Sequence, residues 1–426
     1  MKRVPLAHVV GWMCASLALP VAAGAQGIRP RALLVYYGFP SSINQTWSVP
    51  AAAQEFGRYD YVLWGDGLNN PGHPDHVSAA AIAAHVYTAH TRFYGYVDLG
   101  VHTQNLPMSE IQASITRWHE MGLDGVHFDN FGYDYGTTRA RQNAAVDFAH
   151  SLGLPVIVNA FRPNDAFAAV VDPVHNPSGT ATRLGPSDFY FYESHGVRLG
   201  QFEPGAEWQQ RADALEALRQ GLGFRVLSTT TSGTDDAGAY DEPAFFYAWH
   251  ASLLYGHEAT GWGEYGYSAH GASNGRAPFR ARPTFFPGSM FVGPVQDSGS
   301  LHRRDTDGGR IEVNSATHAY DFSPSSTDVP GSGGSTGGTL GAFPNPSRGP
   351  TRFGFTLAQP RGVSLSVLDA SGRRVATIFS GPLSAGRHQP SWPGLDDAGG
   401  RVAPGSYFVV LESGGARSVA RFVVER

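Results

Sequence analysis

Short apolar runs and longer amphipathic stretches alternate along the first two thirds of the chain. The runs have the length of buried β-strands, and the stretches between them carry apolar residues at helical spacing. The eight predicted strands are 31–38, 59–66, 92–100, 125–128, 154–161, 188–195, 224–231 and 259–264. Eight alternations within about 240 residues predict a (β/α)8 TIM barrel.

The predicted helices are 50–56, 76–89, 109–121, 138–152, 204–220 and 240–255. The third opens with Ser109 and Gln112 in capping-box spacing, and Gly153 provides a stop for the fourth. A doubly wound open sheet is the competing arrangement, but no Gly-rich phosphate fingerprint follows the first strand. We therefore predict an α/β barrel over residues 28–322, with short strands from 290 onward covering its last elements.

The pattern changes beyond residue 322. Residues 323–341 are rich in Gly, Ser and Thr, which predicts a flexible linker and a domain boundary. Residues 342–426 alternate apolar and polar positions in runs separated by turn signals. We predict a small all-β sandwich there.

The N-terminus has the order of a secretory signal. Lys2 and Arg3 precede an apolar run that ends in small residues at Ala25, so residues 1–25 are expected to be removed on export. Cys14 is the only cysteine and would leave with the signal. The mature chain is then expected to lack disulfides and thiolate chemistry.

The composition of the chain limits the classes of partner that it could bind. Lys and Arg number 31 against 36 Asp and Glu, and the formal net charge is -5, so no basic footprint for nucleic acid is present. No apolar run beyond the signal approaches membrane-spanning length. We expect a secreted or outer-surface protein, monomeric, without a nucleic-acid partner.

The stretch 122–136 carries the main chemical signal. An apolar strand ends abruptly at Asp129 and Asn130, and a TIM barrel keeps its reactive groups at the carboxyl ends of its strands. The alternative is that Asp129 only turns the chain or caps the next segment. Other predicted strands end in the same way, with Tyr37, Trp64, Asp66, Asp98, His102, Asn159, Arg162, Glu193, His195, Thr229 to Thr231, Trp262 and Glu264.

Acids and aromatics dominate these strand ends, a mixture that suits a sugar. Pyranose rings stack on aromatic faces, while their hydroxyls bond to carboxylates and amides. The predicted substrate-binding residues are Tyr37, Trp64, Asp66, Asp98, Asn130, Asn159, Arg162, Trp262 and Glu264.

Asp129 and Glu193 are the predicted catalytic pair. Glycosidic cleavage needs two carboxyl groups, about 5 Å apart for retention or about 6.5 to 9.5 Å for inversion. We assign Glu193 as the acid, because its aromatic neighbours would raise its pKa, and Asp129 as base or nucleophile. The alternative for Glu193 is a salt bridge to Arg162 or an ordinary binding contact.

Other chemistries find less support. His73, Asp75 and His76 form a small cluster, but a helix N-terminus explains it better than a metal site. Ser194 and Ser228 lack the Gly-x-Ser-x-Gly context of a serine hydrolase. We expect neither a metal nor an organic cofactor.

Two family resemblances extend these predictions. The segments Tyr36-Tyr-Gly, Tyr94-Gly-Tyr-Val-Asp-Leu-Gly, Ile115-Thr-Arg-Trp and Gly122-Leu-Asp-Gly-Val-His-Phe-Asp-Asn resemble the spherulin-4-like TIM barrels. That group includes glycoside hydrolase families 114 and 135. The resemblance implies endo cleavage of α-1,4-linked galactosamine polymers, with Asp129 as the carboxylate carried over most directly.

The C-terminal segment resembles the FlgD-type immunoglobulin-like module. The resemblance is carried by Phe343-Pro-Asn-Pro, Leu368-Asp-Ala-Ser-Gly-Arg, Trp392-Pro-Gly-Leu-Asp-Asp and Pro404-Gly-Ser-Tyr-Phe. It is similar to the sorting domains of a type IX secretion route, which implies contact with secretion machinery or the cell surface.

Three functional hypotheses follow. The leading one is an exported, endo-acting glycoside hydrolase whose partner is an amino-sugar-containing exopolysaccharide. The second is a non-catalytic barrel that binds surface polysaccharide and is tethered by its C-terminal module. The third is a sugar-processing enzyme for another linkage, similar to an α-galactosidase.

Overall fold

The computed structural model describes residues 27–65, 67–232, 240–264, 275–324 and 340–425, apart from 344, 346, 348, 358, 370–372 and 415. Eight parallel strands close into a barrel in the order β1-β10-β9-β6-β5-β4-β3-β2, which confirms the predicted fold class. The strands are β1 (Arg31–Tyr36), β2 (Tyr61–Trp64), β3 (Arg92–Asp98), β4 (Gly125–Asp129), β5 (Val156–Val158), β6 (Phe189–Glu193), β9 (Arg225–Thr229) and β10 (Ala259–Gly261).

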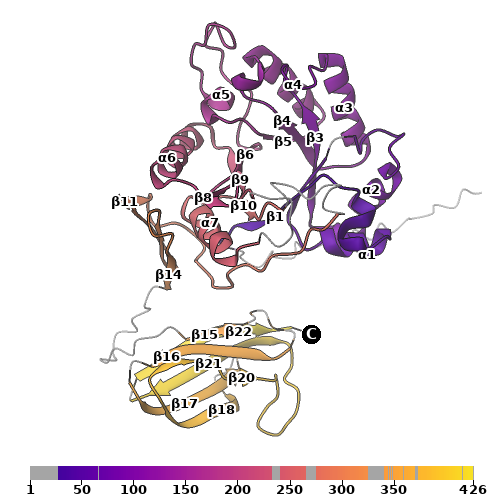
Figure 1. Ribbon diagram of the computed structural model, residues 1–426. Helices are drawn as coiled ribbons and strands as arrows, with labels where there is room; N and C mark the ends of the chain where they lie inside the picture. Colours follow the sequence, from indigo (N-terminus) through magenta and orange to yellow (C-terminus); the bar gives the residue numbers. More distant parts are fainter. Residues whose placement is uncertain are drawn as a thin grey trace, which may run out of the picture.

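Helices surround the barrel in chain order, from α1 and α2 through α3, α4, α5 and α6 to α7 (Figure 1). They are α1 (Val49–Phe56), α2 (His76–Ala83), α3 (Met108–Glu120), α4 (Arg139–Ser151), α5 (Pro163–Phe167), α6 (Gly205–Leu222) and α7 (Glu242–Leu254). Short 3-10 turns are η1 (Pro40–Gln45), η2 (Val86–Thr88) and η3 (Tyr133–Tyr135), and a small hairpin of β7 (Val197–Arg198) and β8 (Gln201–Phe202) follows β6.

Two helix predictions were wrong in detail. The predicted helix 76–89 is shorter, because the hydroxyl of Thr88 donates to the Ile82 carbonyl at 2.7 Å and satisfies the end of α2. The predicted capping box is absent, because α3 begins at Met108 with Pro107 at its N-cap and no side-chain cap. By contrast, Thr138 caps α4 by accepting from the backbone N–H of Arg141.

The barrel has two buried layers that follow from strand alternation. Residues two apart on a strand point to the same side, so one set fills the barrel and the other packs under the helices. The inner layer consists of Leu33, Val35, Tyr61, Leu63, Tyr94, Ile157, Phe189, Phe191, Leu227 and Ala259. The outer layer includes Leu34, Val62, Trp64, Phe93, Val97, Trp118, Val126 and Phe128.

An antiparallel sheet of β11 (Gln296–Ser298), β12 (Leu301–Thr306), β13 (Gly309–Asn314) and β14 (Tyr320–Pro324) follows the barrel. It lies alongside α7 (Figure 1), against which β13 and β14 pack. Ile311 and Val313 join Phe245, Trp249 and Leu253 of α7 in one apolar cluster. These strands therefore cover the last elements of the barrel, as predicted.

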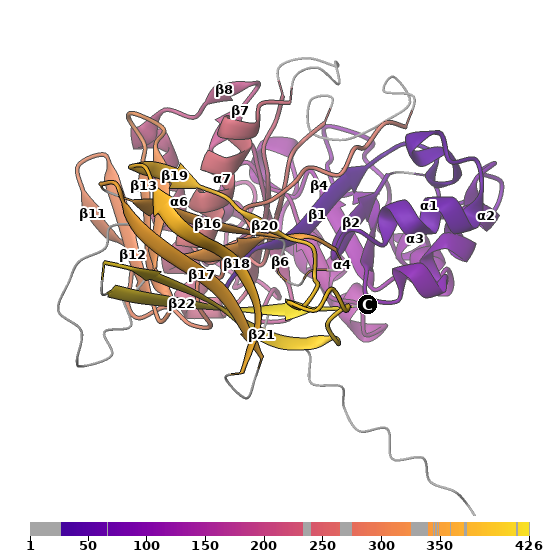
Figure 2. The same cartoon turned by 90° about the horizontal axis from the view of Figure 1, so that it is seen from below.

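The C-terminal module is a sandwich of two antiparallel sheets, visible in Figure 2. One sheet contains β15 (Gly341–Phe343), β16 (Thr351–Leu357), β19 (Gly386–His388) and β20 (Ser391–Trp392). The other contains β18 (Arg374–Leu383), β17 (Arg361–Asp369), β21 (Gly405–Ser413) and β22 (Ala416–Val424). Phe353, Trp392 and Phe422 lie in the core between them. Residues 1–25 and most of the predicted linker lie outside the described residues.

Candidate active site

Four consecutive strands bring the predicted acids and amide together. In the barrel register Asp129 pairs with Asp98 on β3, while Phe128 pairs with Val158 on β5. Val158 pairs in turn with Tyr190 on β6. Asp129 and Glu193 fall on the inward-facing positions of β4 and β6, with one strand between them. The carboxyl end of β3–β6 is therefore the candidate site.

Asp129 is a largely desolvated carboxyl group. One carboxylate oxygen accepts the backbone N–H of Asn130 at 2.9 Å, and the hydroxyl of Tyr96 also bonds to it. Burial raises the pKa of Asp129 to about 6, and the negative charges of Glu193 and Asp98 add to the rise, while these two hydrogen bonds oppose it. A carboxyl of this kind exchanges its proton near neutral pH.

Glu193 lies in the wall of a pocket of about 220 Å³. The side-chain amide of Asn159 donates to its Oε2 at 3.0 Å. Burial raises the pKa of Glu193, and the Asn159 hydrogen bond and the positive charge of Arg211 counteract that rise. The pocket is lined by Tyr135, Asn159, Ala160, Phe161, Tyr190, Glu193, Ser194, Arg198 and Arg211.

The residue after each acid has left-handed backbone. Asn130 has φ 54° and Ser194 has φ 63°. Asn tolerates this region better than most residues, and Ser194 is supported by a 2.8 Å bond between its hydroxyl and that of Thr231. Such backbone costs energy and clusters at functional sites, because the surrounding structure must hold it in place. Here the left-handed backbone turns the chain sharply at the residue directly after each acid.

Aromatic side chains form the floor below the acids. Tyr37 lies at the top of the inner layer and meets Tyr96 edge-on at 5.6 Å. Below Asp129 on the same strand, the ring of His127 lies 5.9 Å from Tyr96 and 5.6 Å from Phe191. Burial lowers the pKa of His127 to about 3, so this imidazole stays neutral.

Three further residues, which were not among the predicted catalytic or substrate-binding residues, belong to the candidate site. Tyr96 bonds to Asp129, and Tyr135 lies in η3, where the charges of Asp129 and Glu193 both raise its pKa after burial. Arg211 on α6 lines the Glu193 pocket and lies 4.5 Å from the Tyr192 ring. It also pairs with Glu203 at 2.6 Å. Tyr96 could have been found, since it precedes Asp98 by two residues and faces the same side.

Several predicted binding residues lie elsewhere. Trp64 belongs to the outer layer, where it packs on Phe93 at 4.4 Å, because Tyr61 and Leu63 take the inward positions of β2. Trp262 is buried against Tyr240 and Phe245. Neither tryptophan presents a face to the barrel mouth, so their predicted stacking role was wrong.

Two charged or titratable strand-end residues are also structural. Glu264 is buried and accepts from Nε of Arg280 at 2.5 Å, which makes it the partner of an ion pair. His195 is buried in the outer layer, 4.6 Å from the ring of His257, and burial lowers its pKa to about 3. Thr229 bonds to the Gly261 carbonyl within the barrel.

The remaining predicted residues have mixed roles. Asp98 accepts from Gly100 N at 2.7 Å and from the Thr103 hydroxyl at 2.6 Å, so it shapes the β3 loop while acting on Asp129 by charge. Asn130 supplies the backbone donor to Asp129. Arg162 is exposed beside a second pocket, and within the described residues it forms no ion pair with Glu193. Asp66 lies outside the described residues.

The cluster of His73, Asp75 and His76 lies at the N-terminus of α2, as predicted. His76 opens α2 and its Nδ1 lies 2.8 Å from the Leu68 carbonyl, while Asp75 accepts from Ser41 N at 2.8 Å. Within the described ranges, no group of three or more His, Cys, Asp or Glu side chains is placed to hold a metal ion. Nor does any helix of those ranges have the length and apolarity needed to cross a membrane.

The family comparison concerns the C-terminal module. Residues 345–416 match the family model described as FlgD Ig-like domain. This module is therefore a FlgD Ig-like domain, as the sequence predicted. Among solved structures, FlgD from Xanthomonas campestris is similar at 27% identity and TM-score 0.17, with 20% of this chain and 63% of that chain covered.

Another solved structure is similar to part of this chain. The carboxyl transferase domain of Rhizobium etli pyruvate carboxylase with 3-bromopyruvate is 12% identical, with TM-score 0.35. The match covers 55% of this chain and 39% of that chain. No curated protein matches the chain.

Proposed function

We propose that the barrel is an exported glycoside hydrolase that cleaves an amino-sugar-containing exopolysaccharide. The observation that carries the proposal is the placement of Asp129 and Glu193 at the carboxyl ends of β4 and β6, close enough for the charge of Glu193 to raise the pKa of Asp129. Most enzymes that hydrolyse glycosidic bonds require two carboxyl groups near the scissile bond, and Asp129 and Glu193 are the candidates here.

The surroundings suggest a role for each acid. Asp129 is fixed by Asn130 N–H and the Tyr96 hydroxyl, two donors that favour its ionised form, so we assign it as nucleophile or base. Glu193 stands in the pocket wall with a pKa raised by burial, which suits a proton donor to the leaving oxygen. Tyr37 and Tyr96 offer apolar surface below the scissile bond.

Charge favours a cationic sugar chain. Asp98, Asp129 and Glu193 are close enough to interact electrostatically at the end of β3–β6. A partly deacetylated galactosamine polymer carries ammonium groups, which such a mouth would attract. This agrees with the activity implied by the spherulin-4-like resemblance.

The C-terminal module supports export. A FlgD Ig-like domain follows the barrel, and the N-terminal residues have the order of a secretory signal. We propose that the module sorts the barrel to the cell surface or the medium, where an exopolysaccharide is found.

The test is release of soluble oligosaccharides from a galactosamine-rich exopolysaccharide by the purified chain. Asp129→Asn and Glu193→Gln are each expected to lower kcat/KM by roughly a thousandfold, the scale of a lost acid or base. Glu110→Gln serves as the control, because Glu110 is an exposed residue of α3 that pairs with Arg117 and does not line the Glu193 pocket.

Other outcomes decide among the alternatives. Binding without any soluble product would replace the hydrolase by a polysaccharide-binding barrel. Cleavage of neutral α-galactosides in preference to the amino-sugar polymer would assign a different linkage.

A further inference from the structure

Phe161 is an exposed aromatic ring beside the Glu193 pocket. It follows β5 two residues after Asn159, and 61% of its surface is accessible. Its side chain lines the Glu193 pocket on one side and a second, larger pocket on the other. An exposed phenylalanine shared by two pockets is well placed to stack against a sugar ring that extends beyond the reacting residue.

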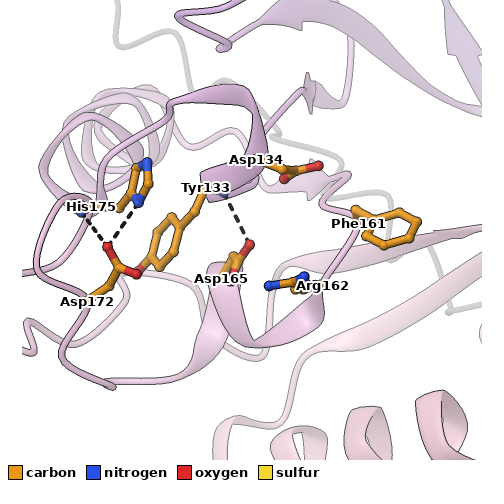
Figure 3. A pocket seen from close by; sticks show the side chains of 7 residues that line it. All are labelled: Tyr133, Asp134, Phe161, Arg162, Asp165, Asp172 and His175. Atoms are coloured by element: carbon orange, nitrogen blue, oxygen red, sulfur yellow. Dashed lines mark hydrogen bonds and ion pairs between the residues drawn. The ribbon is translucent and has the colours of Figure 1, made fainter.

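The second pocket has a volume of about 570 Å³ and is formed by the loops after β4 and β5. Its far wall is rigid, because the Tyr133 ring stacks on His175 at 5.0 Å with an interplanar angle of 9°. Asp172 accepts from His175 N at 2.7 Å, and Asp165 accepts from Tyr133 N at 3.2 Å. Figure 3 shows these internal bonds on one side of the pocket and Phe161 on the other.

Asp134 and Arg162 stand between these walls (Figure 3). Both line the pocket, and within the described residues neither side chain forms an ion pair or a side-chain hydrogen bond. The Asp134 carboxylate and the Arg162 guanidinium, whose charge also acts on the nearby Asp165, can bond to hydroxyl, amino or acetamido groups of a ligand. Apolar surface beside a few free polar groups is the usual composition of a carbohydrate subsite.

We infer that this second pocket, the Phe161 pocket, is a distal subsite for the next sugar residue of the same glycan chain. The inference rests on the proposed function, since Glu193 marks the residue that reacts. The neighbouring ring stacks on Phe161, and its polar edge bonds to Asp134 and Arg162. With a subsite beyond the cleavage point, the barrel would bind several consecutive sugars of the polymer and not only a single terminal sugar.

The charge of the pocket limits the ligand. Three carboxyl groups, Asp134, Asp165 and Asp172, face one guanidinium, Arg162. The acidic excess disfavours uronic acids, because a carboxylate on the sugar would be repelled. Neutral and amino sugars fit.

The experiment measures binding in the full chain carrying Asp129→Asn, so that hydrolysis does not consume the probe. The probes are galactosamine and an α-1,4-linked galactosamine hexasaccharide. A galacturonic acid hexasaccharide is the control for charge. Phe161→Ala and Asp134→Asn are compared with Val77→Ala, which truncates an exposed apolar side chain of α2 that lines neither pocket. The dissociation constants are read by calorimetry.

Phe161→Ala is expected to weaken hexasaccharide binding about fivefold, the scale of one lost ring contact, and to leave monosaccharide binding unchanged. Asp134→Asn should weaken binding of the galactosamine hexasaccharide and strengthen binding of the galacturonic acid hexasaccharide. Equal hexasaccharide affinity for Phe161→Ala and Val77→Ala would overturn the subsite, even if the wild-type chain cleaves the polymer.

The results that would contradict the proposed function differ from those that would contradict the distal subsite. A chain that binds the hexasaccharide in a Phe161-dependent manner but releases no product keeps the subsite and loses the hydrolase. If the hexasaccharide binds no more tightly than the monosaccharide to the Asp129→Asn chain, no distal subsite exists.

Discussion

The side-chain amide of Asn159 donates to Oε2 of Glu193 at 3.0 Å, joining β5 to β6 at the mouth of the barrel. This bond favours the ionised form of Glu193 and holds its carboxyl in the pocket wall. A residue that directly follows β5, the strand between the two acids, therefore holds Glu193 and counteracts the rise in its pKa that burial causes.

Removing that donor should change catalysis in a recognisable way. Asn159→Ala is expected to raise the pKa of Glu193 and to move the alkaline limb of the kcat/KM profile to higher pH, with about a tenfold loss of rate from disorder of the acid. A pH–rate profile on the soluble polymer measures both effects. If the rate falls but the pH dependence of kcat/KM does not shift, Asn159 has only a packing role.

The proton affinity of Asp129 predicts a stability effect. Its pKa is raised from 3.8 to about 6, so the folded state gains stability from protonation below pH 3.8 and loses that gain as the pH rises through 6. Asp129→Asn should then stabilise the chain at pH 7 by about 1 to 2 kcal/mol, and far less at pH 4. Thermal unfolding at the two pH values tests this, and a stabilisation independent of pH would contradict it.

The coupling between the acids can be measured directly. The charge of Glu193 raises the pKa of Asp129, so Glu193→Gln should bring the pKa of Asp129 below 6. Carbon-13 NMR titration of the carboxyl group reports the change without requiring activity. Glu110→Gln, which also removes a carboxylate, should leave the Asp129 titration where it is.

Gly95 on β3 is required by the packing of Trp118. A Cβ added at Gly95 would lie 2.1 Å from Cδ2 of Trp118, whose indole N–H donates to the Tyr96 carbonyl at 3.0 Å. Gly95→Ala should destabilise the barrel by about 2 kcal/mol through overpacking. Gly185→Ala, where an added Cβ meets nothing within 4 Å, is the matched control in a thermal melt.

The sequence predicted the barrel because its periodicity is repeated eight times. It also singled out Asp129, Asn159 and Glu193, because polar residues at the ends of buried strands stand out. The structure brings these three residues to one end of the barrel, and their roles stay predictions. It misplaced Trp64 because both faces of a parallel strand are apolar, so the run 61–64 does not reveal which residues point inward. Arg211 was missed because it belongs to a helix, where only tertiary packing brings it to the pocket.

The left-handed residues Asn130 and Ser194 have a consequence for how this scaffold can vary. Each acid sits on the last residue of its strand, and the chain departs immediately afterwards, so the carboxyl groups are anchored to the sheet and not to the segments above it. Those segments can lengthen, shorten or exchange residues while the two carboxyl groups keep their places.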